Sequence, residues 1–183
     1  MSNVLIISGH PNLKQSIANQ AIIDELAQLL PQAHIRKLDE LHQHYEFDVA
    51  TEQQALENAD IIVWQVPFYW YAMPALMKKW LDDTFVHGFA HGSGAKLAGK
   101  KLLVSITTGA PDTAYQKDGF FQHTMEDYLA GFKTTATLCQ LSYCGAMWLN
   151  GVSYVGRDEQ AILEQQAQAR RYAKELANKI TTL

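Results

Sequence analysis

The chain has 183 residues and a formal net charge of −4, with 48% hydrophobic and 19% charged residues. This length suits one domain over residues 1–183, and the composition argues against a disordered chain. No apolar run approaches the roughly 20 residues of a transmembrane helix, and no signal peptide follows Met1, so we expect a cytoplasmic protein. The slightly acidic balance weighs against nucleic acid as a partner, because phosphate backbones attract basic surfaces.

Short apolar runs alternate with amphipathic segments along the chain. We predict strands at residues 4–7, 34–38, 61–66, 101–107 and within 146–155. We predict helices at about residues 16–30, from a capping box at Thr51, and at about 75–85, 123–136 and 158–180. This alternation favours an α/β fold with right-handed crossovers. The expected architecture is a flavodoxin-like three-layer sandwich, with a five-stranded parallel sheet of order 2-1-3-4-5.

Residues 8–19 join the first predicted strand to the first predicted helix. Gly9 contributes a turn, and the helical pattern begins near Ser16. A helix N-terminus presents unpaired backbone N–H groups and the positive end of the helix dipole, so this segment suits a phosphate monoester. Ser16 and Asn19 either donate to that phosphate or cap the helix. The ordinary alternative makes Ser16 a simple N-cap and His10 a surface loop residue.

Two further loops follow predicted strands. Residues 67–71 form an aromatic run after the third strand, and residues 107–111 turn after the fourth. In open parallel sheets, ligands bind outside the carboxyl ends of the strands where the strand order reverses, so we expect both loops to join residues 8–19 in one site. Trp70 and Tyr71 lie at a strand end and favour a ring-binding role or a dimer contact over simple packing.

Several other side chains have ordinary structural interpretations. Trp64 and Trp80 fall within buried strand and helix patterns, so we expect them in the core. His87 and His91 are four residues apart with no third ligand evident, and we assign no metal site to the chain.

The ordered motifs resemble a known family. They are residues 8–19, the segment 64–76, and Thr107-Thr108-Gly109 followed by Tyr115. Together they are similar to the flavin-dependent NAD(P)H:quinone oxidoreductases of the DT-diaphorase type. The segments 47–53 and 88–90 are similar to the ancillary proteins of bacterial glutathione-gated potassium efflux (Kef) systems within that family.

The resemblance implies a bound flavin, FMN or alternatively FAD, with NAD(P)H as electron donor and a quinone or similar small electrophile as acceptor. It implies a two-electron ping-pong hydride transfer, catalysed by an NAD(P)H dehydrogenase (quinone) that forms a homodimer. Tyr115 is the catalytic residue that it indicates. The cofactor-binding residues that it implies are His10, Ser16, Ile17, Ala18, Asn19, Pro67, Phe68, Tyr69, Trp70, Tyr71, Thr108, Gly109, Ala110 and Pro111.

The alternative function is that of a Kef-type regulatory subunit, which docks on a potassium efflux transporter and would place the protein peripherally at the inner membrane.

Two departures from the family pattern bear on the site. Phe121 stands where DT-diaphorase has a histidine, with His123 nearby, so we expect Tyr115 to act alone. Pro111 has no N–H and removes one backbone donor.

Overall fold

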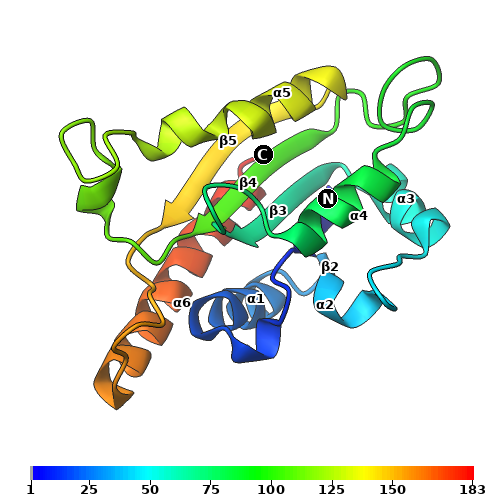
Figure 1. Ribbon diagram of the computed structural model, residues 1–183. Helices are drawn as coiled ribbons and strands as arrows, with labels where there is room; N and C mark the ends of the chain where they lie inside the picture. Colours follow the sequence, from blue (N-terminus) through cyan, green and yellow to red (C-terminus); the bar gives the residue numbers. More distant parts are fainter. Residues whose placement is uncertain (1) are drawn as a thin grey trace.

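In the computed structural model, which describes residues 2–183, five parallel strands form one sheet of order β2-β1-β3-β4-β5 (Figure 1). The strands are β1 (Val4–Ser8), β2 (His34–Lys37), β3 (Ile61–Pro67), β4 (Lys101–Thr107) and β5 (Ser142–Leu149). The predicted flavodoxin-like fold and strand order are confirmed. The order reverses at β1, between β2 and β3, which is where such sheets bind ligands.

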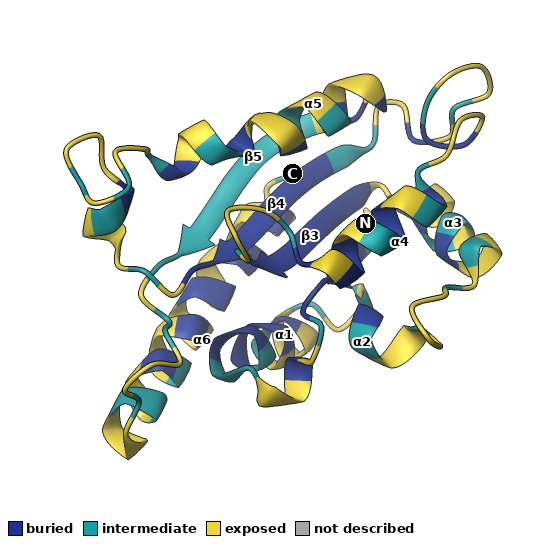
Figure 2. Ribbon diagram, viewed as in Figure 1, coloured by how far each residue is buried: buried dark blue, intermediate teal, exposed yellow. Residues whose placement is uncertain are grey.

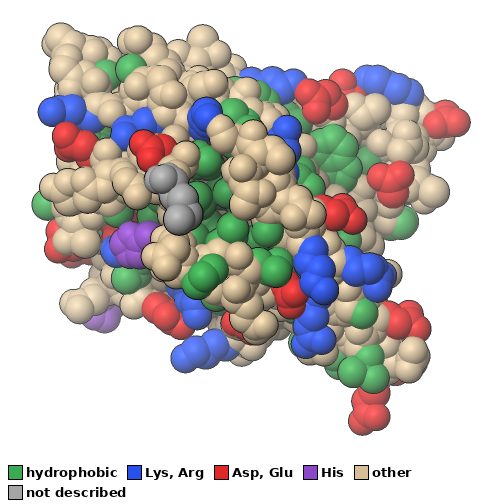
Figure 3. Space-filling view, turned by 180° about the vertical axis from the view of Figure 1, so that it is seen from behind, with side chains coloured by type: hydrophobic (Ala, Val, Ile, Leu, Met, Phe, Trp, Pro, Cys, Tyr) green, Lys and Arg blue, Asp and Glu red, His purple; other side chains and the backbone are tan. Residues whose placement is uncertain are grey.

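Helices cover both faces of the sheet (Figure 1). Helices α1 (Ile17–Leu29) and α6 (Glu159–Thr181) lie on one face, and α3 (Val49–Asn58), α4 (Ala75–Thr84) and α5 (Ala130–Leu138) lie on the other. The shorter elements are α2 (Leu38–Leu41) and the 3₁₀ turns η1 (Leu13–Gln15), η2 (Asp112–Tyr115) and η3 (Met125–Leu129). Figure 3 shows the molecule from behind, with Lys and Arg side chains gathered over α6. The sequence of this helix contains both basic and acidic residues.

Strand β3 is buried at every position and separates two hydrophobic cores. Ile61 and Val63 face α1 and α6, whereas Ile62 and Trp64 face α3, α4 and α5. Trp64 and Trp80 are both fully buried, which confirms them as core residues. Figure 2 shows β3 and most of β4 in the buried colour and the edge strand β5 as intermediate, so the central strands form the most protected part of the sheet.

The last predicted strand and the helix before it are displaced from their expected positions. Strand β5 begins at Ser142 and ends at Leu149. Gly145, with a φ of 101°, lies where the strand shifts its register against β4. Residues 150–158 then form a loop rather than the end of a strand. The helix predicted at 123–136 is divided into η3 and α5.

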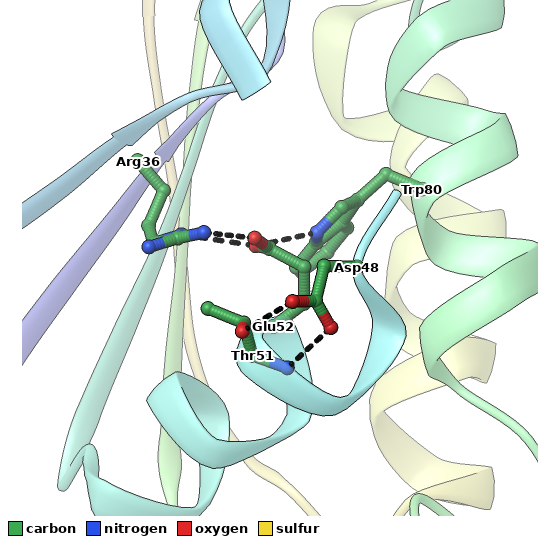
Figure 4. A network of polar contacts seen from close by, with 5 residues as sticks. All are labelled: Arg36, Asp48, Thr51, Glu52 and Trp80. Atoms are coloured by element: carbon green, nitrogen blue, oxygen red, sulfur yellow. Dashed lines mark hydrogen bonds and ion pairs between the residues drawn. The ribbon is translucent and has the colours of Figure 1, made fainter. Parts of the chain in front are cut away.

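The capping box predicted at Thr51 is wrong. Helix α3 begins at Val49, because the Asp48 carboxylate accepts the backbone N–H of Thr51 at 3.1 Å and caps the helix three residues earlier. Glu52 therefore lies within the helix, and its side chain points into the protein. Its carboxylate accepts hydrogen bonds from the Arg36 guanidinium and from the Trp80 indole N–H (Figure 4). This contact ties the edge strand β2 to α3 and α4.

Candidate functional site

A cavity of about 520 Å³ lies at the carboxyl ends of the strands around the point where the strand order reverses. The loops that follow β1, β3, β4 and β5 all contribute to it. Its lining residues are His10, Pro11, Asn12, Gln15, Ser16, Ile17, Ala18, Asn19, Pro67, Phe68, Tyr69, Thr107, Thr108, Gly109, Val152, Ser153, Tyr154 and Arg157. The volume falls within the range of small-molecule and cofactor sites, roughly 300–1,000 Å³.

Ten of the fourteen residues proposed for cofactor binding line this cavity, from three separate loops. They are His10, Ser16, Ile17, Ala18, Asn19, Pro67, Phe68, Tyr69, Thr108 and Gly109. The other four, Trp70, Tyr71, Ala110 and Pro111, and the proposed catalytic Tyr115, lie outside the cavity lining. The three loops therefore meet at the carboxyl ends of the strands as predicted, but not every residue proposed within them lines the cavity.

Ser16 is the N-cap of α1, and its hydrogen bonds fix the direction of its hydroxyl. Ser16 Oγ accepts the backbone N–H of Asn19 at 3.2 Å and the Asn19 side-chain amide at 2.9 Å. Since two donors occupy its lone pairs, its own O–H is left to donate elsewhere. The backbone N–H groups of Ile17 and Ala18 belong to the first turn of α1, where they have no partner within the helix. All three groups are donors on residues that line the cavity.

Asn19 is buried and points inward, toward the sheet. Its Oδ1 accepts the Gln65 amide at 2.6 Å and the Thr107 hydroxyl at 3.0 Å. The Asn19 carbonyl oxygen thus holds α1 against β3 and β4, while its amide donates to Ser16. Ser16 caps the helix, as one of the two expected roles requires, and donation from Ser16 or Asn19 to a phosphate stays a prediction.

His10 and Tyr69 join the loops after β1 and β3. His10 Nδ1 accepts the backbone N–H of Asn12 at 3.1 Å, so a neutral ring carries its proton on Nε2, which lies 3.2 Å from the Tyr69 hydroxyl. Burial lowers the pKa of His10 below its ordinary value of 6.5 and outweighs the opposite effect of Asp39. A neutral His10 donates to the Tyr69 oxygen, which leaves the Tyr69 O–H free to donate.

Gly9 permits the close approach of α4 to the loop after β1. A Cβ atom at this position would lie 2.9 Å from Met77 Cβ and 2.9 Å from Val66 Cγ1. Its backbone N–H donates to the Gln65 carbonyl at 2.9 Å and continues the pairing of β1 with β3. A larger residue would therefore force the loop, α4 or β3 to shift.

A cluster of aromatic rings adjoins the cavity at Phe68. The Phe68 ring lies 6.5 Å from Tyr115 and 6.1 Å from Tyr71, and Tyr115 lies 4.9 Å from Phe121. Tyr115 is buried, and burial raises its pKa above the ordinary value of 10, so its hydroxyl stays protonated at neutral pH and is able to donate. Phe121 thus packs against Tyr115 where DT-diaphorase places a histidine.

Trp70 and Tyr71 form the tip of a tight turn closed by a hydrogen bond from Ala72 N–H to the Tyr69 carbonyl at 3.1 Å. Both residues have positive φ angles, 49° and 64°, an arrangement that costs of order 1–3 kcal/mol per non-glycine residue. Trp70 is 92% exposed and makes the turn a projecting aromatic surface. Such strain is concentrated at functional sites in many proteins.

The loop after β5 contributes four lining residues that the sequence reasoning missed: Val152, Ser153, Tyr154 and Arg157. The rule that ligands bind at the carboxyl ends of parallel strands also applies to this loop. It was not applied, because the last strand was predicted within residues 146–155 and this range includes the loop. Arg157 is the only lysine or arginine among the residues that line the cavity.

Residues 2–174 match a protein family described as having a flavodoxin-like fold. The chain belongs to this flavodoxin-like family. It is 34% identical over 181 residues to the glutathione-regulated potassium-efflux system ancillary protein KefG of Cronobacter sakazakii, covering 98% of this chain and 95% of that protein. Kef ancillary proteins are therefore relatives of this chain, as the sequence motifs indicated.

Solved structures of the flavodoxin-like family resemble the fold closely. General stress protein 14 of Treponema denticola, solved in complex with FMN, has a TM-score of 0.85 and 31% identity, covering 97% of this chain and 99% of that one. An NADPH-quinone reductase from P. pentosaceus has a TM-score of 0.74 and 26% identity, covering 93% and 97% of the two chains. Within residues 2–183, no helix is both long enough and apolar enough to cross a bilayer.

Proposed function

We propose that this chain is a flavin-dependent NAD(P)H:quinone oxidoreductase that binds FMN in the cavity at the carboxyl ends of β1, β3 and β4. The observation that carries the proposal is the direction of the hydrogen-bond donors. Ser16 O–H, Tyr69 O–H and the first N–H groups of α1 belong to residues that line the cavity, and none has an acceptor within residues 2–183. A set of donors at a helix N-terminus matches a phosphate monoester.

The remaining lining also fits a flavin. Phe68 and the neighbouring aromatic cluster offer flat apolar surface for a ring system, and the turn at Thr108–Gly109 offers backbone groups for its polar edge.

A bound flavin supplies the hydride chemistry, accepting two electrons from NAD(P)H and passing them to a quinone. The residues of this chain orient and shield it. Tyr115 lies outside the cavity lining but packs beside Phe68, which lines it. We propose that Tyr115, held protonated by burial, donates a hydrogen bond to the flavin or the quinone without the help of a histidine. The similar structures, one solved with FMN and one of an NADPH-quinone reductase, support the choice of cofactor and reaction. FAD instead of FMN, and a homodimer, stay predictions.

The direct test is the visible spectrum of the purified protein with its cofactor mass, followed by NAD(P)H oxidation with a soluble quinone. We expect flavin absorbance and turnover. We expect Tyr115→Phe to lower kcat by about a hundredfold, as for loss of a positioned proton or hydrogen-bond donor, while flavin affinity stays the same. Tyr45→Phe serves as the control, because Tyr45 lies in an exposed turn and does not line the cavity. A preparation that neither carries nor binds flavin would exclude the proposal.

A second candidate is a regulatory subunit of a potassium efflux transporter. It is favoured by the 34% identity with KefG over nearly the whole of both chains. We propose that the chain docks on such a transporter. Co-purification with a Kef transporter, and potassium efflux sustained by the Tyr115→Phe variant, would support it. Efflux that stops with this variant would tie regulation to turnover instead.

A further inference from the structure

The cavity holds a single permanent charge. Of its lining residues, His10, Tyr69, Tyr154 and Arg157 are ionisable and none is an acid. Burial holds His10 toward its neutral form and raises the pKa of Tyr69, so neither carries a charge at neutral pH. Arg157 alone is cationic throughout the working range. A phosphate monoester, with a charge of about −2 at neutral pH, would find one full counter-charge here.

The Arg157 guanidinium has no ion-pair or hydrogen-bond partner within residues 2–183. The adjacent carboxylate, Asp158, is already used: its Oδ1 accepts the backbone N–H of Ala161 at 2.8 Å and caps α6. An arginine that lines a cavity and is not paired by its own chain is free to bind an anion.

The loop that carries Arg157 is fastened across the cavity on two sides. Val152 N–H donates to the Thr108 carbonyl at 2.9 Å, which joins the loop to the turn after β4. Gln165, on α6, donates its side-chain amide to the Ser153 carbonyl at 2.8 Å. Arg157 lies four residues after Ser153 and precedes the first turn of α6, so its stretch of the loop is held at both ends. Arg157 and the start of α1 line the same cavity.

We propose that Arg157 pairs with the 5′-phosphate of the bound flavin and makes the site selective for phosphorylated flavin over riboflavin. This inference rests on the proposed flavin site and adds a residue from the fourth loop to it. Arginine suits the role because its planar guanidinium donates two parallel hydrogen bonds to a phosphate, in addition to the charge. The neutral donors of α1 and Ser16 then orient the phosphate, and Arg157 supplies the charge.

The test is titration of FMN, FAD and riboflavin into protein stripped of flavin, followed by quenching of flavin fluorescence. We expect Arg157→Gln to weaken FMN binding about ten- to hundredfold and to change riboflavin binding by no more than about twofold, because only the phosphate contact is lost. Arg157→Lys should recover part of the FMN affinity, and the salt dependence of FMN binding should be smaller in Arg157→Gln than in the wild type. Arg171→Gln, an exposed substitution on α6 with the same change of charge, should match the wild type.

Three results would overturn the inference. They are equal weakening of FMN and riboflavin, no weakening of either, or a raised KM for NADPH with unchanged FMN affinity, which would assign Arg157 to the nicotinamide cofactor. Titration with FAD distinguishes a phosphate monoester from a phosphate diester. A loss of affinity in Arg157→Gln that is greater for FMN than for FAD supports pairing with the monoester. Failure of the wild type to bind any flavin would instead refute the proposed function, so the two failures are distinguishable. An unchanged melting temperature in Arg157→Gln confirms that the variant is folded.

Discussion

Two buried polar clusters on opposite faces of the sheet differ in what they leave unpaired. The closed cluster consists of Arg36, Glu52 and Trp80, and the open cluster consists of Ser16, Asn19, Gln65 and Thr107. In the closed cluster, both Glu52 oxygens receive donors, from the Arg36 guanidinium and from the Trp80 indole N–H at 3.0 Å (Figure 4). In the open cluster, Gln65 Oε1 has no partner within residues 2–183 and the Ser16 O–H has no internal acceptor.

The contrast separates polar groups that serve the fold from those that we propose serve a ligand. The closed cluster is charged, lies away from the flavin cavity and leaves no Glu52 oxygen unpaired, so we expect it to fix β2 against α3 and α4. The open cluster is neutral and lies directly under the cavity, and the order of its hydrogen bonds turns donors outward. Substitutions in the two clusters should therefore separate stability from flavin binding.

The largest effect on stability is expected in the closed cluster. Glu52→Gln leaves the guanidinium of Arg36 half-buried without a counter-charge, and removal of one partner from a buried pair costs about 3 kcal/mol of unfolding free energy or more. Urea unfolding measures this change. The flavin affinity of the folded variant should be unchanged.

Asp82→Asn is the matched control, because it breaks the exposed Lys78–Asp82 pair of α4 and should cost less than about 1 kcal/mol. If Glu52→Gln were no more destabilising than Asp82→Asn, the closed cluster would not have the structural role given to it here.

Asn19→Ala should destabilise the protein less than Glu52→Gln and should weaken flavin binding more. Loss of Asn19 Oδ1 leaves the buried Gln65 amide and Thr107 hydroxyl without their acceptor, at a cost of about 1–3 kcal/mol. Ser16 also loses a donor that fixes its hydroxyl, so FMN affinity should fall by roughly tenfold although Asn19 itself faces inward. Chemical unfolding and flavin fluorescence measure the two effects separately.

Asn58→Ala at the end of α3 removes only an exposed contact with Gln54, and should change neither quantity appreciably. Binding by Asn19→Ala that equals the wild type would show that Ser16 needs no support from the open cluster.

The sequence predicts the sheet and most of the cavity because both follow from local patterns. Apolar runs mark the strands, and the carboxyl ends of parallel strands meet, so residues 8–19, 67–69 and 107–109 assemble as expected. The loop of Arg157 was missed because apolar residues at 152, 154 and 155 continue the pattern of β5, while Gly151, with a φ of 79°, marks the turn. A single glycine in an apolar run does not locate a strand end.

Glu52 shows a second limit, since a glutamate on a polar helix is expected to face water. Its burial depends on Arg36, sixteen residues away on another element, and on Trp80, which the sequence places only in the core. Long-range pairing of this kind has no local pattern. The direction of the Ser16 hydroxyl likewise depends on Asn19, which β3 and β4 hold in position.

The smallest expected effects compare two helix N-caps, Ser16 of α1 and Asp48 of α3. Ser16→Ala removes the cap at a cost of about 1 kcal/mol, and it also removes an outward donor, so FMN affinity should fall by several-fold. Asp48→Ala also removes a cap, but α3 lies away from the cavity, so flavin binding should not change.

The two caps also differ in their response to pH. Hydrogen bonds from Thr51 lower the pKa of Asp48 below its ordinary value of 3.8. The stabilising contribution of Asp48 is therefore fully present above 3.8 and is lost as the pH falls through the lower pKa of the folded state. The serine cap has no such dependence. Thermal unfolding of Ser16→Ala and Asp48→Ala between pH 2 and pH 7 should show their difference from the wild type shrinking at low pH for Asp48→Ala alone. An equal loss of FMN affinity in both variants would mean that helix stability, and not the direction of the Ser16 hydroxyl, controls the site.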